Sequence, residues 1–215
     1  MRAYRGLNRF GERLGADDYS VLRFDYASTG DSAGDACEAR VEEWLENIAT
    51  AAAELRRRAS VDHLCIVGLR LGALLAQRAV TNGVKASHLL LWDPPAGGSS
   101  WLETLRGFDS AYHQILNGQR ARALKLPPLP PTQLLGIQLP AELKTAIESL
   151  TLTSAPAGVE QLIAVSTDSS PQGLGSDALR LPSPGEWSLL SRMTTPWNPA
   201  SAIHVVASTL RERLP

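Results

Sequence analysis

The sequence has 215 residues, of which 44% are hydrophobic and 20% are charged, and its net charge is −1. This composition and length suit one soluble domain with a sizeable core, so residues 1–215 are expected to form a single domain. The near-neutral charge shows no electrostatic footprint for nucleic acid or an anionic membrane, so neither is expected as a partner. No apolar run approaches the ~18 residues that a membrane span needs.

Hydrophobic periodicity predicts that helices and strands alternate in the first half of the chain. The expected helices lie at residues 2–15, 38–59 and 71–82, and the expected strands lie at 19–24, 63–68 and 88–95. The first helix is amphipathic and lacks the apolar core of a signal peptide, so a cytoplasmic location is expected. The alternation predicts a mostly parallel sheet with crossover helices on both faces.

The segment 97–155 interrupts this alternation. It begins with GGSS, contains the proline run KLPPLPP, and ends near the helix-forming stretch AELKTAIESLTL. An insertion after a sheet strand is a common place for a lid, so we interpret 97–155 as a helical cap within the domain. Beyond it, strands are expected at 159–167 and 186–192, followed by a closing helix at 199–214.

The junction between the strand at 63–68 and the next helix carries the stretch VGLRLGA. Gly68 and Gly72 bracket Arg70 in the spacing G-x-R-x-G, which is the layout of a nucleophile elbow, G-x-S-x-G. In such an elbow the central residue occupies a strained turn above the carboxyl edge of the sheet, and the following helix points its N-terminus there. A generic strand–helix turn is the alternative interpretation of the two glycines.

Three stretches resemble α/β-hydrolases and occur in the expected order: LRFDYASTGDSAGD, the elbow, and LLLWDPPAGG. The first is similar to the family segment fD-x-r-G-x-G-x-S, here carried by Phe24, Asp25, Thr29, Gly30, Asp31 and Ser32. Nearly the whole chain resembles the hydrolase-like proteins associated with exosortase systems, relatives of the serine aminopeptidase group. Some of those proteins also have G-L-R-L-G-A at the elbow.

This resemblance implies an α/β-hydrolase-like fold from which the first strands are missing, and a helical cap insertion. It also implies hydrolysis of an ester, amide or thioester bond through a serine nucleophile. The setting that it suggests is exopolysaccharide production and protein sorting in a bacterium.

The family's chemistry needs a nucleophile, an acid and a histidine base, in the order Ser, Asp or Glu, His. Arg70 cannot be the nucleophile, because its guanidinium stays protonated and has no lone pair to offer. Asp168 occupies the place of the acid, with Asp177 as a second candidate. The loop before the closing helix, MTTPWNPAS, contains no histidine, and His204 falls inside that helix, where a structural role is expected. We therefore expect a degenerate elbow without serine-hydrolase activity.

Arg70 has two open interpretations. It can bind an anionic group, because a guanidinium pairs bidentately with a carboxylate or phosphate near a helix N-terminus. It can instead pair internally with Asp25, Asp93 or Asp168, which are all predicted at carboxyl ends of strands. By the resemblance, Leu71 would supply one backbone N–H of an oxyanion hole. The candidate ligand site therefore comprises Arg70, Leu71, Asp25 and Asp93.

Neither a metal nor a cofactor is expected, because no Cys/His cluster has zinc spacing and the four histidines are scattered. The two cysteines, Cys37 and Cys65, are not expected to form a disulfide framework. Three functions stay open. The first is a ligand-binding or accessory module for a small anionic or acyl ligand. The second is a hydrolase that uses Asp25, Asp93 or Asp168 with water. The third is an interaction protein that forms a homodimer through an uncovered sheet edge beginning at Tyr19.

Overall fold

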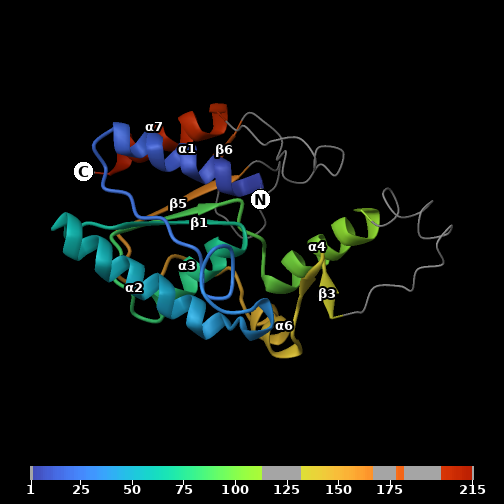
Figure 1. Cartoon of the computed structure of the whole chain (residues 1–215). Helices are drawn as coiled ribbons and strands as arrows, with labels where there is room; N and C mark the ends of the chain where they lie inside the picture. Colours follow the sequence, from blue (N-terminus) through green and yellow to red (C-terminus); the bar gives the residue numbers. More distant parts are fainter. Residues whose placement is uncertain (1, 113–131, 167–177, 182–199, 215) are drawn as a thin grey trace.

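The structure, a computed structural model, describes residues 2–112, 132–166, 178–181 and 200–214 (Figure 1). Asp168, Asp177, the proline run KLPPLPP and the strand expected at 186–192 lie outside the described residues.

A parallel sheet forms the centre of the described part of the chain. Its strands are β1 (Cys65–Leu69), β2 (His88–Trp92), β5 (Gln161–Ser166) and β6 (Leu179–Arg180), arranged in the order β1-β2-β5-β6. Each neighbouring pair in this order is parallel. The strands predicted at 63–68, 88–95 and 159–167 and the parallel sheet are confirmed. The carboxyl ends of these strands therefore meet at one edge of the sheet.

Helices cover both faces of the sheet (Figure 1). The helices that flank it are α1 (Arg2–Ala16), α2 (Val41–Ala59), α3 (Leu71–Thr81) and α7 (Ala200–Arg213). α1 and α7 pack on one face, where Phe10 and Val206 join a buried cluster with Trp92. α2 and α3 lie on the opposite face (Figure 1). The predicted helices are confirmed, and no helix in the described ranges is long and apolar enough to cross a membrane.

Strand β2 shows why a continuous apolar run forms a strand here. Leu89, Leu90 and Leu91 are each 0% exposed. Leu90 packs in the cluster with α1 and α7, whereas Leu89 and Leu91 pack in the cluster with α3. A strand that is covered on both faces needs no polar alternation. Burial of each such leucine contributes about 1.5–3 kcal/mol relative to an exposed side chain.

The prediction of a strand at residues 19–24 is wrong. These residues form no strand and pair with none in the described part of the chain. Val21 and Phe24 are 44% and 38% exposed. The residue types in YSVLRF favour a strand, but a strand also needs a hydrogen-bonded neighbour, and the local pattern does not supply one. In the described part of the chain, the sheet ends at β1 and not at a strand that begins at Tyr19.

The described parts of the segment 97–155, residues 97–112 and 132–155, pack against the main core rather than standing apart from it. It contains α4 (Gly98–Tyr112), β3 (Gln133–Leu134), β4 (Ile137–Gln138) and α6 (Ala141–Glu148). Leu102 of α4 and Ile147 of α6 belong to the same buried cluster as Trp44 of α2 and Leu74 of α3. The helical content predicted for this segment is confirmed in α4 and α6.

The hairpin formed by β3 and β4 was not expected from the sequence. Its turn has Leu135 at φ 52° and Gly136 at φ 79°, so both residues occupy the left-handed region that a two-residue hairpin turn requires. The Leu135 N–H donates to Asp109 Oδ1 at 3.0 Å, which ties the turn to α4. The sequence does not predict this hairpin, because the turn has Leu-Gly where Asn-Gly or Asp-Gly is typical.

Gln77 is a buried polar residue that fixes the end of this segment to α3. It is 1% exposed. Its Nε2 donates to the carbonyl oxygen of Thr153 at 2.7 Å and to that of Ser154 at 3.2 Å. Its Oε1 accepts from the Thr153 N–H at 3.0 Å. Because these bonds use both the donor and the acceptor of the amide, the burial of Gln77 is compensated.

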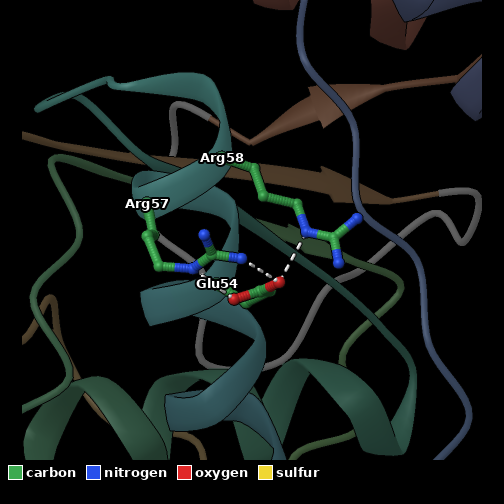
Figure 2. Close-up of polar contacts among 3 residues, drawn as sticks. All are labelled: Glu54, Arg57 and Arg58. Atoms are coloured by element: carbon green, nitrogen blue, oxygen red, sulfur yellow. Dashed lines mark hydrogen bonds and ion pairs between the residues drawn. The ribbon is translucent and has the colours of Figure 1, made fainter.

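An exposed ion-pair cluster closes the C-terminal end of α2 (Figure 2). Arg57 donates two hydrogen bonds to the Glu54 carboxylate, at 2.8 and 2.9 Å, and Arg58 Nε donates to Glu54 Oε1 at 2.5 Å. These hydrogen bonds lower the pKa of Glu54 to about 2. The arginines also complement the negative end of the helix dipole. Exposed pairs of this kind contribute little to stability.

The two cysteines are free and are expected to differ sharply in reactivity. Burial raises the pKa of the Cys65 thiol to about 12, whereas Cys37 is exposed. Because the thiolate is the reactive form, we expect one fast equivalent with 5,5′-dithiobis(2-nitrobenzoate) in the native protein. Cys65 should react about 100-fold more slowly until the protein unfolds. In Cys37→Ser the fast equivalent should vanish, and its persistence would contradict the prediction.

Candidate functional site

The candidate site is built on a one-residue turn between β1 and α3. β1 ends at Leu69, α3 begins at Leu71, and Arg70 alone connects them, with φ 54° and ψ −118°. The Arg70 N–H donates to the Trp92 carbonyl oxygen at 2.8 Å, and the Arg70 carbonyl accepts from the Ala73 N–H at 2.9 Å. Residues other than glycine rarely adopt this backbone conformation, which carries strain of about 1–3 kcal/mol. The turn is therefore tight and strained, as the elbow motif predicts.

Gly68 is required by the close approach of β1 to α3. A Cβ at this position would lie 2.5 Å from Ala73 Cα and 2.7 Å from Ala73 N. Both atoms belong to the helix backbone and cannot rotate away as the end of a side chain could. At Gly72 a Cβ would meet nothing within 4 Å. Steric crowding thus explains the glycine at position 68, whereas the packing does not require a glycine at position 72.

The Arg70 side chain reaches from the turn to the first helix of the 97–155 segment. Its Cζ lies over the Trp101 ring, 4.8 Å from the ring centroid. A guanidinium in this position is attracted by the negative face of the aromatic ring. Both side chains are half-buried. The sequence gives no signal for this contact, because α4 is remote from Arg70 along the chain.

Asp93 lies directly after β2 at the same edge of the sheet. It has φ 46°, which is a second left-handed conformation at a non-glycine residue. Its N–H donates to the Val165 carbonyl oxygen at 2.8 Å. Because Arg70 N–H bonds to the carbonyl of Trp92, the backbones of Arg70 and Asp93 lie next to each other. The structure thus brings together two of the predicted site residues, each strained and each at a strand end.

Leu71 is the first residue of α3, so its N–H belongs to the helix turn that faces the Arg70 position. The first N–H groups of a helix have no intrahelical acceptors, and the helix dipole adds partial positive charge there. The predicted donor and Arg70 therefore lie together at one helix N-terminus. This arrangement favours an anion over a cation or a neutral apolar group.

Asp25 serves mainly to close its own loop. Its Oδ2 accepts from the Asp31 N–H at 3.3 Å, and its carbonyl accepts from Ser32 Oγ at 2.8 Å. Gly30 has φ 57°, and a Cβ there would lie 2.7 Å from Asp25 Cγ. The motif that resembles the hydrolase segment thus forms a compact turn around the Asp25 carboxylate. These contacts give Asp25 and Ser32 structural roles.

This loop is attached to α2. The Ala27 N–H donates to Asn47 Oδ1 at 2.8 Å, and Trp44 Nε1 donates to the Ala27 carbonyl oxygen at 3.0 Å. The Tyr26 ring packs against the Trp44 ring in a tilted arrangement, with centroids 5.7 Å apart and an interplanar angle of 39°. Burial raises the pKa of Tyr26 to about 12, so the Tyr26 phenol stays protonated at physiological pH.

The remaining predicted residues lie elsewhere. His204 is an exposed residue of α7, where it lines a shallow groove of about 310 Å³ with Arg9, Arg13 and Ile203. α7 packs on the sheet face opposite α3, as described above, so His204 belongs to another surface. Asp168 lies outside the described residues. Among the described residues, no group of three or more His, Cys, Asp or Glu side chains could hold a metal ion.

No protein-family model matches the chain. No curated protein matches it either. The described residues form a mixed α/β protein with a parallel four-stranded sheet flanked by helices. The resemblance to α/β-hydrolases stays a prediction that is based on the three sequence stretches.

Proposed function

We propose that this chain is a hydrolase-like binding protein whose elbow holds an anionic group at Arg70 instead of carrying a nucleophile. The observation that carries the proposal is the strained backbone of Arg70, at φ 54° and ψ −118°, between β1 and α3. Strained conformations at non-glycine residues cluster at functional sites, because selection for stability alone removes them. A glycine would occupy this turn without the strain, so stability alone does not favour an arginine at this position.

The chemistry of that side chain is anion recognition. The guanidinium stays positively charged at all physiological pH values and offers planar N–H donors that match a carboxylate or phosphate. Trp101 supports the guanidinium at 4.8 Å through its ring, and this contact orients the side chain without using a hydrogen-bond acceptor. The N-terminal turn of α3 adds backbone N–H donors at the same place.

The same geometry argues against acyl-enzyme catalysis at this position. A guanidinium has no lone pair with which to attack a carbonyl, and it cannot take up a proton as a general base. The ligand that fits is a small carboxylate or phosphate, or an acyl compound with such a head group. An accessory role in exopolysaccharide production or protein sorting is the setting that the sequence resemblance supports.

The proposal is tested by thermal unfolding with inorganic phosphate and with acetate, at constant ionic strength set by sodium chloride. We expect one of these anions to raise the melting temperature of the wild-type protein, because ligands that bind only the native state stabilise it. Arg70→Ala should abolish the increase. Arg78→Ala is the matched control, since Arg78 lies at the other end of α3 and donates to the Ser149 carbonyl at 3.4 Å.

An equal increase in Arg70→Ala and wild type, or no increase with either anion, would contradict anion binding at the elbow. A second measurement addresses catalysis. The wild-type protein should not hydrolyse p-nitrophenyl acyl esters of any chain length. Turnover that Arg70→Ala abolishes would show that Arg70 takes part in a reaction and would overturn the non-catalytic part of the proposal.

A further inference from the structure

The groove that contains His204 lies between α1 and α7, which pack side by side on one face of the sheet (Figure 1). Two residues of α1 and three of α7 line it: Arg9, Arg13, Ala200, Ile203 and His204. Its volume of about 310 Å³ lies at the lower end of the range for small-molecule sites. Because α3 packs on the opposite face of the sheet, this groove is separate from the Arg70 site (Figure 1).

Two arginines supply the positive charge of this groove. Arg9 and Arg13 are four residues apart in α1, so they lie on the same face of the helix. Arg9 is exposed, and the side chain of Arg13 is 40% exposed, so a ligand in the groove can reach both. The whole protein has a net charge of −1, so this pair of positive charges is a local feature of the α1 surface.

The carboxylates of α1 and of the residues that directly follow it do not cancel this charge. Glu12, the one acidic residue of α1, lines the separate groove beside residues 19–23. Asp17 lies 3.4 Å from Arg13 and 3.8 Å from Arg211. Both distances exceed the about 2.7–2.9 Å of a charge-assisted hydrogen bond. Asp17 therefore shares one negative charge between two arginines and does not use up the donors of Arg13.

The α7 side of the groove also favours an anion. α7 begins at Ala200, and its first turn contains no acidic residue. The first N–H groups of a helix have no intrahelical acceptors and carry partial positive charge. His204 is exposed one turn further along and offers an imidazole N–H as another donor. The groove thus combines two guanidinium groups, an imidazole and a helix N-terminus, and each of these favours an anion.

The spacing of the two arginines selects the kind of anion. Four residues of helix separate Arg9 from Arg13 by a rise of about 6 Å. Each guanidinium can bind one phosphoryl group bidentately. Two phosphoryl groups joined through one oxygen can therefore occupy both arginines together, whereas a single phosphate must draw both side chains toward one centre. A diphosphate group also carries more negative charge than a single phosphate or carboxylate.

We propose that the groove between α1 and α7 binds a diphosphate group, with one phosphoryl group held by Arg9 and the other by Arg13. His204 and the first-turn N–H groups of α7 supply further donors. Ala200 and Ile203 offer an apolar wall for the organic part of a diphosphate ester. This second site does not depend on anion binding at Arg70.

The test is isothermal titration calorimetry of the full chain with inorganic pyrophosphate, without divalent cations and at an ionic strength fixed by sodium chloride. All proteins carry Arg70→Ala, so the elbow cannot contribute a second anion site. We expect saturable binding at one site in the micromolar range, and binding of orthophosphate that is about tenfold weaker or more. Adenosine diphosphate distinguishes the source of the group. Tighter binding than pyrophosphate would indicate a diphosphate ester as the ligand, and weaker binding would indicate free diphosphate.

Two variants and a matched control assign the site. Arg9→Gln and Arg13→Gln should each weaken pyrophosphate binding about tenfold, because each removes one bidentate partner. Arg23→Gln removes the same charge from the groove beside residues 19–23 and should bind within about twofold of the parent protein. Absence of binding, unchanged binding by Arg9→Gln or Arg13→Gln, an equal loss in Arg23→Gln, or equal binding of orthophosphate would overturn the inference.

Amide chemical shifts of the wild-type protein give a readout that does not depend on the folding of a variant. Pyrophosphate should shift the NMR signals of the Ser201, Ala202 and Ile203 amides in the first turn of α7, because the bound anion lies against these N–H groups. The arginine Nε–H signals of Arg9 and Arg13 should shift with the same concentration dependence. Shifts confined to the start of α3 would place the diphosphate at the elbow and would overturn the inference.

Discussion

Replacing Gly68 by alanine is expected to lower the free energy of unfolding by about 3 kcal/mol. The added Cβ would lie 2.5 Å from Ala73 Cα and 2.7 Å from Ala73 N, well inside the contact distance of these atoms. Relief requires β1 and α3 to move apart, and both are held in place. Leu74 and Leu75 of α3 are each 1% exposed in the core, so a shift of the helix opens space around them.

Gly72→Ala is the matched control for this prediction. It adds the same methyl group on the other side of Arg70, where nothing lies within 4 Å. Because Gly72 is in the first turn of α3, alanine should stabilise the protein slightly, by up to about 0.5 kcal/mol. Urea unfolding monitored by circular dichroism measures both variants. Equal stabilities for the two would mean that the close approach of β1 and α3 does not exist in solution.

Much of the sheet could be predicted from sequence because its strands are marked by composition alone. The runs HLCIV, HLLLW and QLIAV are apolar without alternation, which is typical of strands covered on both faces. The pair Asn82-Gly83 is a helix stop signal, and α3 ends directly before it, at Thr81. These signals are local, so no knowledge of distant contacts is needed to interpret them.

The wrong prediction at residues 19–24 has a non-local cause. Its residue types match a strand as well as those of β1 do, but strand formation depends on a neighbour. The hairpin at β3 and β4 was missed for a related reason. Leu135 is held in its left-handed conformation by Asp109 of α4, a contact between residues far apart in sequence.

The candidate site was partly predictable. The spacing of Gly68, Arg70 and Gly72 predicts a tight strand–helix turn, and the structure has one. The left-handed backbone of Asp93 could not be predicted, because a residue before proline favours an extended backbone with negative φ and Asp93 has φ 46°. The contact between Arg70 and Trp101 depends on how the 97–155 segment packs on α2 and α3, and this packing is decided by the buried cluster as a whole.

Arg70→Gly is expected to be more stable than Arg70→Ala by about 1 kcal/mol, which reverses the usual order of these residues. Both changes remove the guanidinium and its contact with Trp101, so that loss cancels in the comparison. Only glycine adopts φ 54° and ψ −118° without strain between Cβ and the backbone. The relief of about 1–3 kcal/mol exceeds the ~0.4–1 kcal/mol that glycine loses through greater freedom of the unfolded chain.

The comparison needs a site where the usual order holds, and Ala49 provides one because it is exposed within α2. Ala49→Gly should lower the free energy of unfolding by about 1 kcal/mol. If Arg70→Gly is instead the less stable variant at the elbow, the backbone there is not strained in solution, and the main support for anion binding is lost. A different result would support the binding site. Arg70→Gly would be the more stable of the two variants, and phosphate or acetate would raise the melting temperature of the wild-type protein but of neither variant. Arg70 would then lower the stability of the fold and bind the ligand, as is common at binding sites.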